Sequence, residues 1–110
     1  MTPFDITAKE SFMKMRIIET LRLVIDPELE ISIIDMGLVY SININELERS
    51  LEIEMTLSSP GCPMGATIVG AVENCMNQYY CNYQTAVNLV WKPAWSYELI
   101  SEEGKQMLGL

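Results

Sequence analysis

Two neighbouring stretches of alternating apolar and polar residues constrain this fold more than any other feature. Segment 51–58 alternates four apolar residues with four polar ones: Leu51, Ile53, Met55 and Leu57 against Glu52, Glu54, Thr56 and Ser58. Segment 38–44 has the same period, with Leu38, Tyr40, Ile42 and Ile44 on one side. A period of two places successive side chains on opposite faces of a strand. Joined by the polar turn 45–49, the two segments predict an antiparallel hairpin with one face on the core.

Segments with helical spacing lie on both sides of the hairpin. A first helix is predicted over residues 8–25, where apolar residues recur on one face: Met13, Ile17, Leu21 and Val24. Thr7 and Glu10 fit a capping box at its start, and Asp26-Pro27 should end it because proline disfavours the helical conformation in the residue before it. A second helix is predicted from residue 63 to about residue 80, with one apolar face: Ile68, Val72, Met76 and Tyr79.

The remaining segments complete a small sheet. Val87, Leu89 and Trp91 share one side of a predicted third strand, and Ser96 with Glu98 could open a short last helix. The predicted fold class is α+β, a small sheet of about three strands with helices packed on one face. Its order is helix, strand, strand, helix, strand, helix. Residues 1–110 fit one domain, with residues 1–7 as a flexible lead.

Charge and composition exclude several classes of function. The 110 residues include 15 acidic and 7 basic side chains and no histidine, for a net charge of −8. This charge repels a phosphate backbone, so we expect no nucleic-acid partner. No apolar stretch reaches the ~18–20 residues of a membrane span, and the first residues lack the apolar core of a signal peptide, so we expect a cytoplasmic protein with no membrane partner. The absence of histidine excludes a Ser-His-Asp triad and imidazole-ligated zinc.

The three cysteines are too widely spaced to form a metal cage within one chain. Cys62, Cys75 and Cys81 contain no CxxC pair. Cys62 lies between Gly61 and Pro63 at the expected N-cap of the second helix, where free N–H groups and the helix dipole favour a thiolate. The alternative is a buried small hydrophobe, which is the usual fate of a free cysteine. Cys75 lies beside the apolar stripe of the helix and is expected to pack in the core.

Two acidic residues and one threonine are further candidates for a site. Asp26 and Glu28 flank Pro27, and paired carboxylates could hold a hard cation, act as acid and base, or recognise a basic partner. Their spacing alone favours a solvated turn in which Asp26 caps backbone N–H groups. Thr56 is expected to face solvent on the polar side of its strand. It becomes of interest because Cys62 follows six residues later, above the end of the same sheet.

Two tryptophans surround a proline in Trp91-Lys-Pro-Ala-Trp95. Such a segment could close an edge of the core or present a docking patch for a partner. The alternation of the third strand points Trp91 to the core, which leaves Trp95 as the candidate for partner docking.

Three segments together resemble the SufT-like metal–sulfur cluster assembly factors, a single-domain family formerly catalogued as a domain of unknown function. These segments are DPELEISIIDMGLVY (26–40), MTLSSPGCP (55–63) and LVWKPAWSYELISEEGKQMLGL (89–110). The resemblance runs from about Arg16 to the C-terminus and implies a small α+β domain. It also implies a role in the maturation of iron–sulfur proteins. The polar positions characteristic of the family fall here on Asp26, Glu28, Thr56 and Cys62, and Cys62 matches its reactive cysteine.

From this resemblance we expect an accessory factor without catalytic turnover, a carrier or adaptor that passes clusters from the iron–sulfur assembly machinery to client apoproteins. A cluster needs about four ligands, so no cofactor is expected to be held tightly by one chain. Cys62 could supply one ligand to a transient cluster or iron in a site shared within a homodimer or with a client, with Asp26 and Glu28 as oxygen ligands or polar contacts nearby. The alternatives are a thiol enzyme or redox protein that uses Cys62, and a pure interaction domain.

Overall fold

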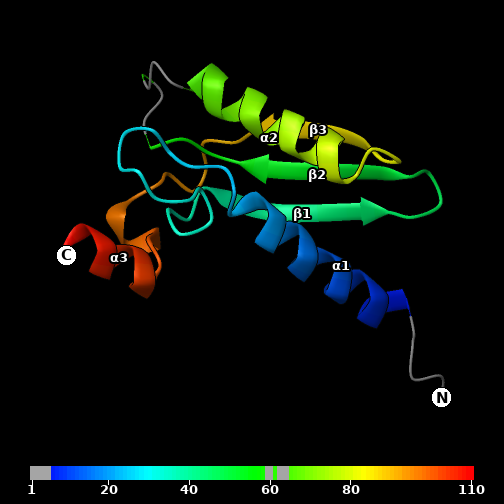
Figure 1. The fold of residues 1–110 in the computed structure, drawn as a ribbon, viewed down its shortest axis with the longest axis horizontal. Coiled ribbons are helices and arrows are strands. Elements are labelled where there is room, and N and C mark those ends of the chain that lie inside the picture. The colour runs from blue at the N-terminus through cyan, green and yellow to red at the C-terminus, as the bar shows by residue number, and fades with distance from the viewer. Residues whose placement is uncertain (1–5, 59–60, 62–64) are drawn as a thin grey trace.

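The computed structural model describes residues 6–58, 61 and 65–110 of the chain. In these residues it has the predicted order of elements (Figure 1). The helices are α1 (Ile6–Leu21), α2 (Gly65–Tyr79) and α3 (Glu102–Leu108), with a 3₁₀ turn at Tyr97–Leu99. The strands are β1 (Val39–Asn45), β2 (Ser50–Met55) and β3 (Gln84–Leu89). The α+β fold predicted from the sequence is therefore confirmed.

The three strands form one sheet with β2 in the centre. β1 and β2 pair antiparallel as the predicted hairpin, and β3 pairs with β2 in parallel. A parallel neighbour requires a crossover connection, and α2 provides it. The register between β1 and β2 shifts between Val39 and Ser41, so Tyr40 is an extra residue on the edge strand. This irregularity bends the edge of the sheet near the end of β2.

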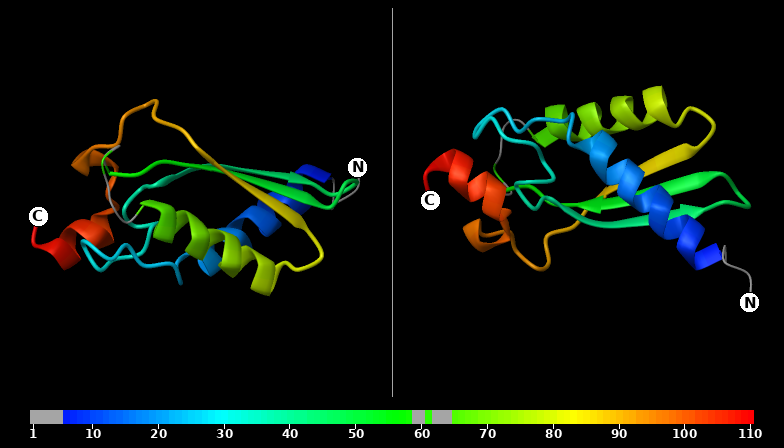
Figure 2. Two further views of the ribbon diagram at one scale, coloured as in Figure 1. Left: turned by 90° about the horizontal axis from the view of Figure 1, so that it is seen from above. Right: turned by 60° about the horizontal axis from the view of Figure 1, so that its bottom comes forward.

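One face of the sheet carries the core and the other is polar. Seen from above, α1 and α2 lie on the same side of the strands (Figure 2, left). The core joins the sheet to both helices through fully buried side chains: Ile17 and Leu21 from α1, Ile53 and Met55 from β2, and Val72 and Met76 from α2. On the other face, Ser41 donates a hydrogen bond of 2.7 Å to Glu54. The alternation of β2 thus sorts its side chains as predicted.

The first helix is displaced from its predicted bounds at both ends. It begins at Ile6, so Thr7 lies within the helix and is not its N-cap. It ends at Leu21 rather than at residue 25, and Val24 N–H donates to the Leu21 carbonyl at 3.0 Å in a tight last turn. Ile33 N–H then donates to the Val24 carbonyl at 3.0 Å. This backbone pairing ends the helix about one turn before the position at which Pro27 would end it.

The C-terminal segment folds as a 3₁₀ turn followed by α3, rather than as one helix opened by Ser96. Ser101 is the N-cap of α3 and accepts a hydrogen bond of 2.9 Å from Gly104 N–H. The 3₁₀ turn lies against the start of the hairpin, where Gly37 has a φ of +75° and contacts the Leu99 carbonyl. A side chain at Gly37 would have neither the conformation nor the space. The C-terminal segment is thereby fixed at the end of the sheet where β2 finishes (Figure 1).

Candidate functional site

The loop that carries the two candidate carboxylates is organised around Asp26. Asp26 Oδ1 accepts hydrogen bonds from Glu28 N–H at 2.8 Å and Leu29 N–H at 3.2 Å. The backbone of Asp26 donates to the Ile31 carbonyl and accepts from Glu30 N–H, both at 2.8 Å. The predicted capping role of Asp26 is therefore confirmed. The predicted solvated turn is wrong, because Asp26 is only 2% exposed. Its carboxylate is buried and stabilises the backbone of the loop.

Glu28 has a different environment from Asp26, although only one residue separates them. The side chain of Glu28 is exposed, while that of Asp26 is buried. The two carboxylates are therefore not presented together to solvent as an acid–base pair. Glu28 is placed at the surface of a loop whose backbone is held by Asp26.

Thr56 is fully buried, which contradicts the expectation of a solvent-facing side chain. It follows directly after β2, and its N–H donates to the Leu38 carbonyl at 2.8 Å. Its two neighbours, Met55 and Leu57, are buried as well. The alternation of buried and exposed side chains along β2 therefore ends at Thr56, because both faces of the chain are buried at this end of the sheet.

A run of backbone hydrogen bonds connects Thr56 to the loop of Asp26. Thr56 N–H donates to Leu38, Leu38 N–H donates to Ile33 at 3.0 Å, and Ile33 N–H donates to Val24 at 3.0 Å. The carboxyl end of β2, the start of the hairpin and the loop 24–33 are thus tied into one layer. We call this end of the sheet the loop end. It lies on the left of Figure 1, together with the first turn of α2.

The first turn of α2 packs closely on the residues that follow β2. A Cβ atom added to Gly65 would lie 2.6 Å from Cδ1 of Leu57, so the two residues are packed closely together. The segment that joins Leu57 to Gly65 therefore starts and finishes at the loop end. Cys62 belongs to this segment but lies outside the described residues, as does its expected position as a helix N-cap. Of the four predicted site residues, Asp26, Glu28 and Thr56 are brought to one end of the sheet.

A polar cluster that the sequence did not indicate locks the C-terminal segment onto the loop end. Asp35 Oδ1 accepts from Ser101 Oγ at 2.8 Å and from Arg22 Nη1 at 3.0 Å, and Asp35 Oδ2 accepts from Ser32 Oγ at 3.3 Å. Burial raises the pKa of the Asp35 carboxyl, but the hydrogen bonds from Ser101 and Arg22 outweigh it and hold that pKa below its usual range. In the sequence, the Ser-x-x-Asp spacing of residues 32–35 is the one sign of this polar cluster.

The two tryptophans have exchanged the places expected for them. Trp91 is 42% exposed, because β3 ends at Leu89 and the alternation does not continue. Trp95 is half-buried against the core, and its Nε1–H donates to the Met36 carbonyl at 2.6 Å. The assignment of Trp91 to the core is therefore wrong. Partner docking by Trp95 stays a prediction, and only part of its ring is available for it.

The described cysteines are not part of the loop end. Cys75 is half-buried against the core, and its Sγ–H donates to the Thr20 carbonyl at 3.7 Å. Burial raises the pKa of the Cys75 thiol. Cys81 is exposed just after α2. Within residues 6–58, 61 and 65–110, no three His, Cys, Asp or Glu side chains are grouped to hold a metal ion. Across the same residues, no helix is both long and apolar enough to cross a membrane.

The fold and the loop end define a class of protein. The model of the family described as "Iron-sulfur cluster assembly protein" matches residues 14–79. The match runs from α1 through α2 and contains the four residues that the sequence analysis proposes for the site: Asp26, Glu28, Thr56 and Cys62. The chain belongs to this family, and the resemblance seen in its sequence motifs is confirmed.

The chain matches individual relatives over nearly the whole length of each relative. The Fe-S protein maturation auxiliary factor SufT of Staphylococcus aureus is 41% identical over 88 residues, which cover 80% of this chain and 99% of that protein. The auxiliary factor YitW of Bacillus subtilis is 36% identical over 92% of this chain and 98% of its own length. A crystal structure of the domain of unknown function DUF59 from Bacillus anthracis superposes with a TM-score of 0.87 at 36% identity, covering 96% of this chain and 99% of that one.

Proposed function

We propose that this chain is an auxiliary factor in the maturation of iron–sulfur proteins, a carrier or adaptor that helps deliver clusters to client apoproteins. The observation that carries the proposal is its 41% identity to a maturation auxiliary factor across 99% of that protein. The cluster is cargo in this role. The partners are the iron–sulfur assembly machinery and the clients, and a thiol in this role requires a reducing compartment such as the cytoplasm.

Cys62 is the proposed cargo thiol, and the residues of the loop end are proposed to position it or the partner. One thiol supplies one of the about four ligands that a cluster needs. The remaining ligands come from a client, from a small thiol or from a second copy of the chain. Glu28, which is exposed, is the carboxylate proposed to contact cargo or partner. Asp26 and Thr56, being buried, act through the backbone of the loop rather than as ligands.

We propose no catalytic turnover of substrate by this chain. A thiol enzyme without histidine would need a carboxylate as its general base. Asp26 is the inner candidate, but its Oδ1 accepts two backbone N–H groups and its side chain is 2% exposed. A carboxylate oxygen that already accepts two backbone N–H groups and is shielded from solvent is badly placed to take a proton from a thiol. The chemistry of the loop end therefore favours holding cargo over activating a thiol for attack.

The test is a strain that lacks the protein. We expect the activities of several unrelated iron–sulfur enzymes to fall while the amounts of their polypeptides are maintained. The wild-type chain and Cys81→Ser should restore these activities, and Cys62→Ser should not. If a single metabolic step fails while cluster enzymes stay active, the protein is a thiol enzyme and the proposal is wrong.

A further inference from the structure

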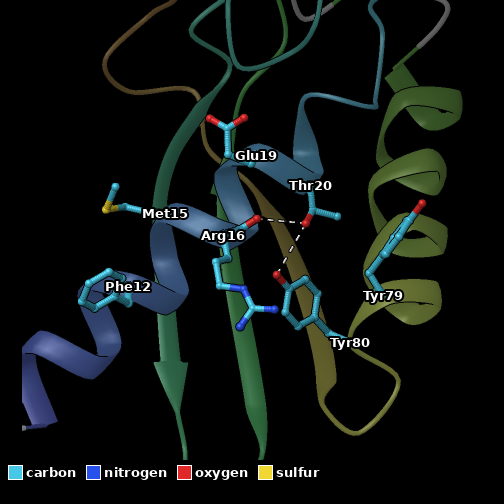
Figure 3. Close-up of a pocket in the computed structure, with 7 residues that line it drawn as sticks. All are labelled: Phe12, Met15, Arg16, Glu19, Thr20, Tyr79 and Tyr80. Carbon is cyan, nitrogen blue, oxygen red and sulfur yellow. Dashed lines mark hydrogen bonds between the residues drawn. The ribbon is translucent and has the colours of Figure 1, made fainter. Parts of the chain in front are cut away.

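A hollow lies between α1 and the end of α2, on the helical side of the sheet (Figure 3). It has a volume of about 470 Å³. Phe12, Met15 and Arg16 line it from α1, and Tyr79 and Tyr80 line it from the end of α2. A second hollow of about 500 Å³ continues it towards the β1–β2 turn and shares Phe12, Arg16, Tyr79 and Tyr80 with it. We call the two hollows together the helix groove.

Large apolar side chains are exposed along the helix groove. Phe12 is 65% exposed, Met15 is 62% exposed and Tyr79 is 54% exposed. Single exposed apolar residues are normal on a protein surface, whereas a group that lines one hollow marks an interaction site. Phenylalanine, tyrosine, methionine and arginine are also the residues enriched in the cores of protein interfaces. The composition of the helix groove is that of a protein-binding surface.

The floor of the helix groove is held in place by hydrogen bonds. Thr20 Oγ1 donates to the Arg16 carbonyl at 2.9 Å and lies 3.5 Å from the hydroxyl of Tyr80. Further along, the Tyr83 hydroxyl donates to Glu46 at 2.9 Å, and the Arg49 guanidinium lies 5.6 Å from the centre of the Tyr83 ring. Two helices and two anchored tyrosines therefore present this surface in a fixed form, which lowers the entropy lost on binding.

The charge that remains available in the helix groove is positive. Glu19 pairs with Arg22 at 3.2 Å. Glu46 accepts the hydrogen bond of Tyr83 and keeps its negative charge, which the positive charge of Arg49 in the lining of the same hollow offsets. Arg16 is exposed and forms no ion pair with any residue that the structure describes. The chain as a whole carries a net charge of −8. That net charge repels an acidic partner at a distance, where salt screens it. At contact, an exposed arginine without an ion pair is complementary to a carboxylate.

We propose that the helix groove binds an acidic amphipathic helix of a partner protein. Apolar side chains of that helix, spaced three or four residues apart, would lie on Phe12, Met15 and Tyr79, as in other helix-in-groove complexes. A glutamate or aspartate on its flank would pair with Arg16. The proposal goes beyond cluster handling, because the groove lies away from the loop end and recognition there needs neither iron nor sulfide.

The probe is a fluorescein-labelled synthetic peptide of about 18 residues, long enough for about five helical turns. It carries leucines at helical spacing and glutamates on both flanks. The matched peptide has lysines in place of the glutamates. Binding is followed by fluorescence anisotropy, and the binding surface by amide shifts of the ¹⁵N-labelled full chain. We expect the acidic peptide to bind at least about tenfold more tightly than the basic one, with shifts centred on Thr20 and Tyr80.

Two charge variants make the test specific to the helix groove. Arg16→Glu should reverse the preference between the two peptides, while Phe12→Ser should weaken both. Lys92→Glu changes the net charge by the same amount at an exposed site outside the groove, so it should leave the preference unchanged. The proposal is overturned if the acidic peptide does not bind at about 1 mM, if Lys92→Glu acts like Arg16→Glu, or if Phe12→Ser instead abolishes self-association, which makes a second copy the occupant.

Discussion

The loop end and the helix groove are built on opposite principles. At the loop end, polar side chains are buried and bound: Asp26 is 2% exposed and Thr56 is 0% exposed. In the helix groove, apolar side chains are left at the surface, and Phe12 is 65% exposed. Buried polar groups must be hydrogen-bonded and so fix local geometry, whereas exposed apolar groups gain most when a partner covers them. The contrast assigns precise positioning to one region and recognition to the other.

Removing the buried carboxylate should give the largest effect on stability. Asp26→Ala would leave the N–H groups of Glu28 and Leu29 without their acceptor, and we expect a loss of about 2–4 kcal/mol in the free energy of unfolding. Asp26→Asn keeps an oxygen acceptor and should lose less. Urea unfolding followed by circular dichroism measures both. If Asp26→Ala unfolds at the same urea concentration as the wild type, the loop end is not held by this side chain.

The cluster around Asp35 should make the same end of the molecule sensitive to acid. The pKa of Asp35 is lowered in the folded state, from about 3.9 in an unfolded chain. Its ionised form therefore stabilises the fold above the unfolded pKa, and this contribution is lost as the pH falls through the folded pKa. Arg22 is 38% exposed, so solvent weakens its share. We expect Asp35→Asn to lower the free energy of unfolding by about 1 kcal/mol at pH 7.

The pH dependence separates this ion pair from simple packing. The difference in unfolding free energy between Asp35→Asn and the wild type should shrink at pH values below the unfolded pKa of about 3.9. A difference that is the same at pH 7 and in acid would mean that the charge of Asp35 does not contribute.

Changes in the helix groove should have the smallest effect on stability. Phe12→Ser removes an exposed side chain, and we expect the free energy of unfolding to change by less than about 0.5 kcal/mol. The same urea experiment measures it, with Asp26→Ala as the variant that shows the sensitivity of the assay. A loss comparable to that of Asp26→Ala would make Phe12 part of the core and remove the contrast between the two regions.

Local patterns in the sequence predicted the parts of the fold that depend on near neighbours. The alternation of residues 51–58 predicted β2, and the helical stripes predicted the buried faces of Ile17 and Leu21 and of Val72 and Met76. The capping role of Asp26 was also predicted, because it links residues two and three positions apart.

Features set by segments far apart in the chain could not be predicted in the same way. Thr56 is buried because the residues around Leu38 cover the end of β2, and Trp91 is exposed because β3 ends two residues before it. The helical spacing predicts Tyr79 on the buried face of α2, but Tyr79 is 54% exposed at the last turn. The signal of the helix groove in the sequence is that Phe12 and Met15 are apolar residues outside the buried stripe of α1.

The role of Cys62 is tested most directly by anaerobic reconstitution of the purified chain with iron and sulfide, followed by absorbance and iron content. We expect less than one labile cluster per chain in the wild type, because one chain does not supply the about four ligands of a stable cluster. We expect the same yield with Cys81→Ser and none with Cys62→Ser. A stable cluster retained by the isolated monomer, or an unchanged yield with Cys62→Ser, would contradict the proposal that Cys62 is the cargo thiol.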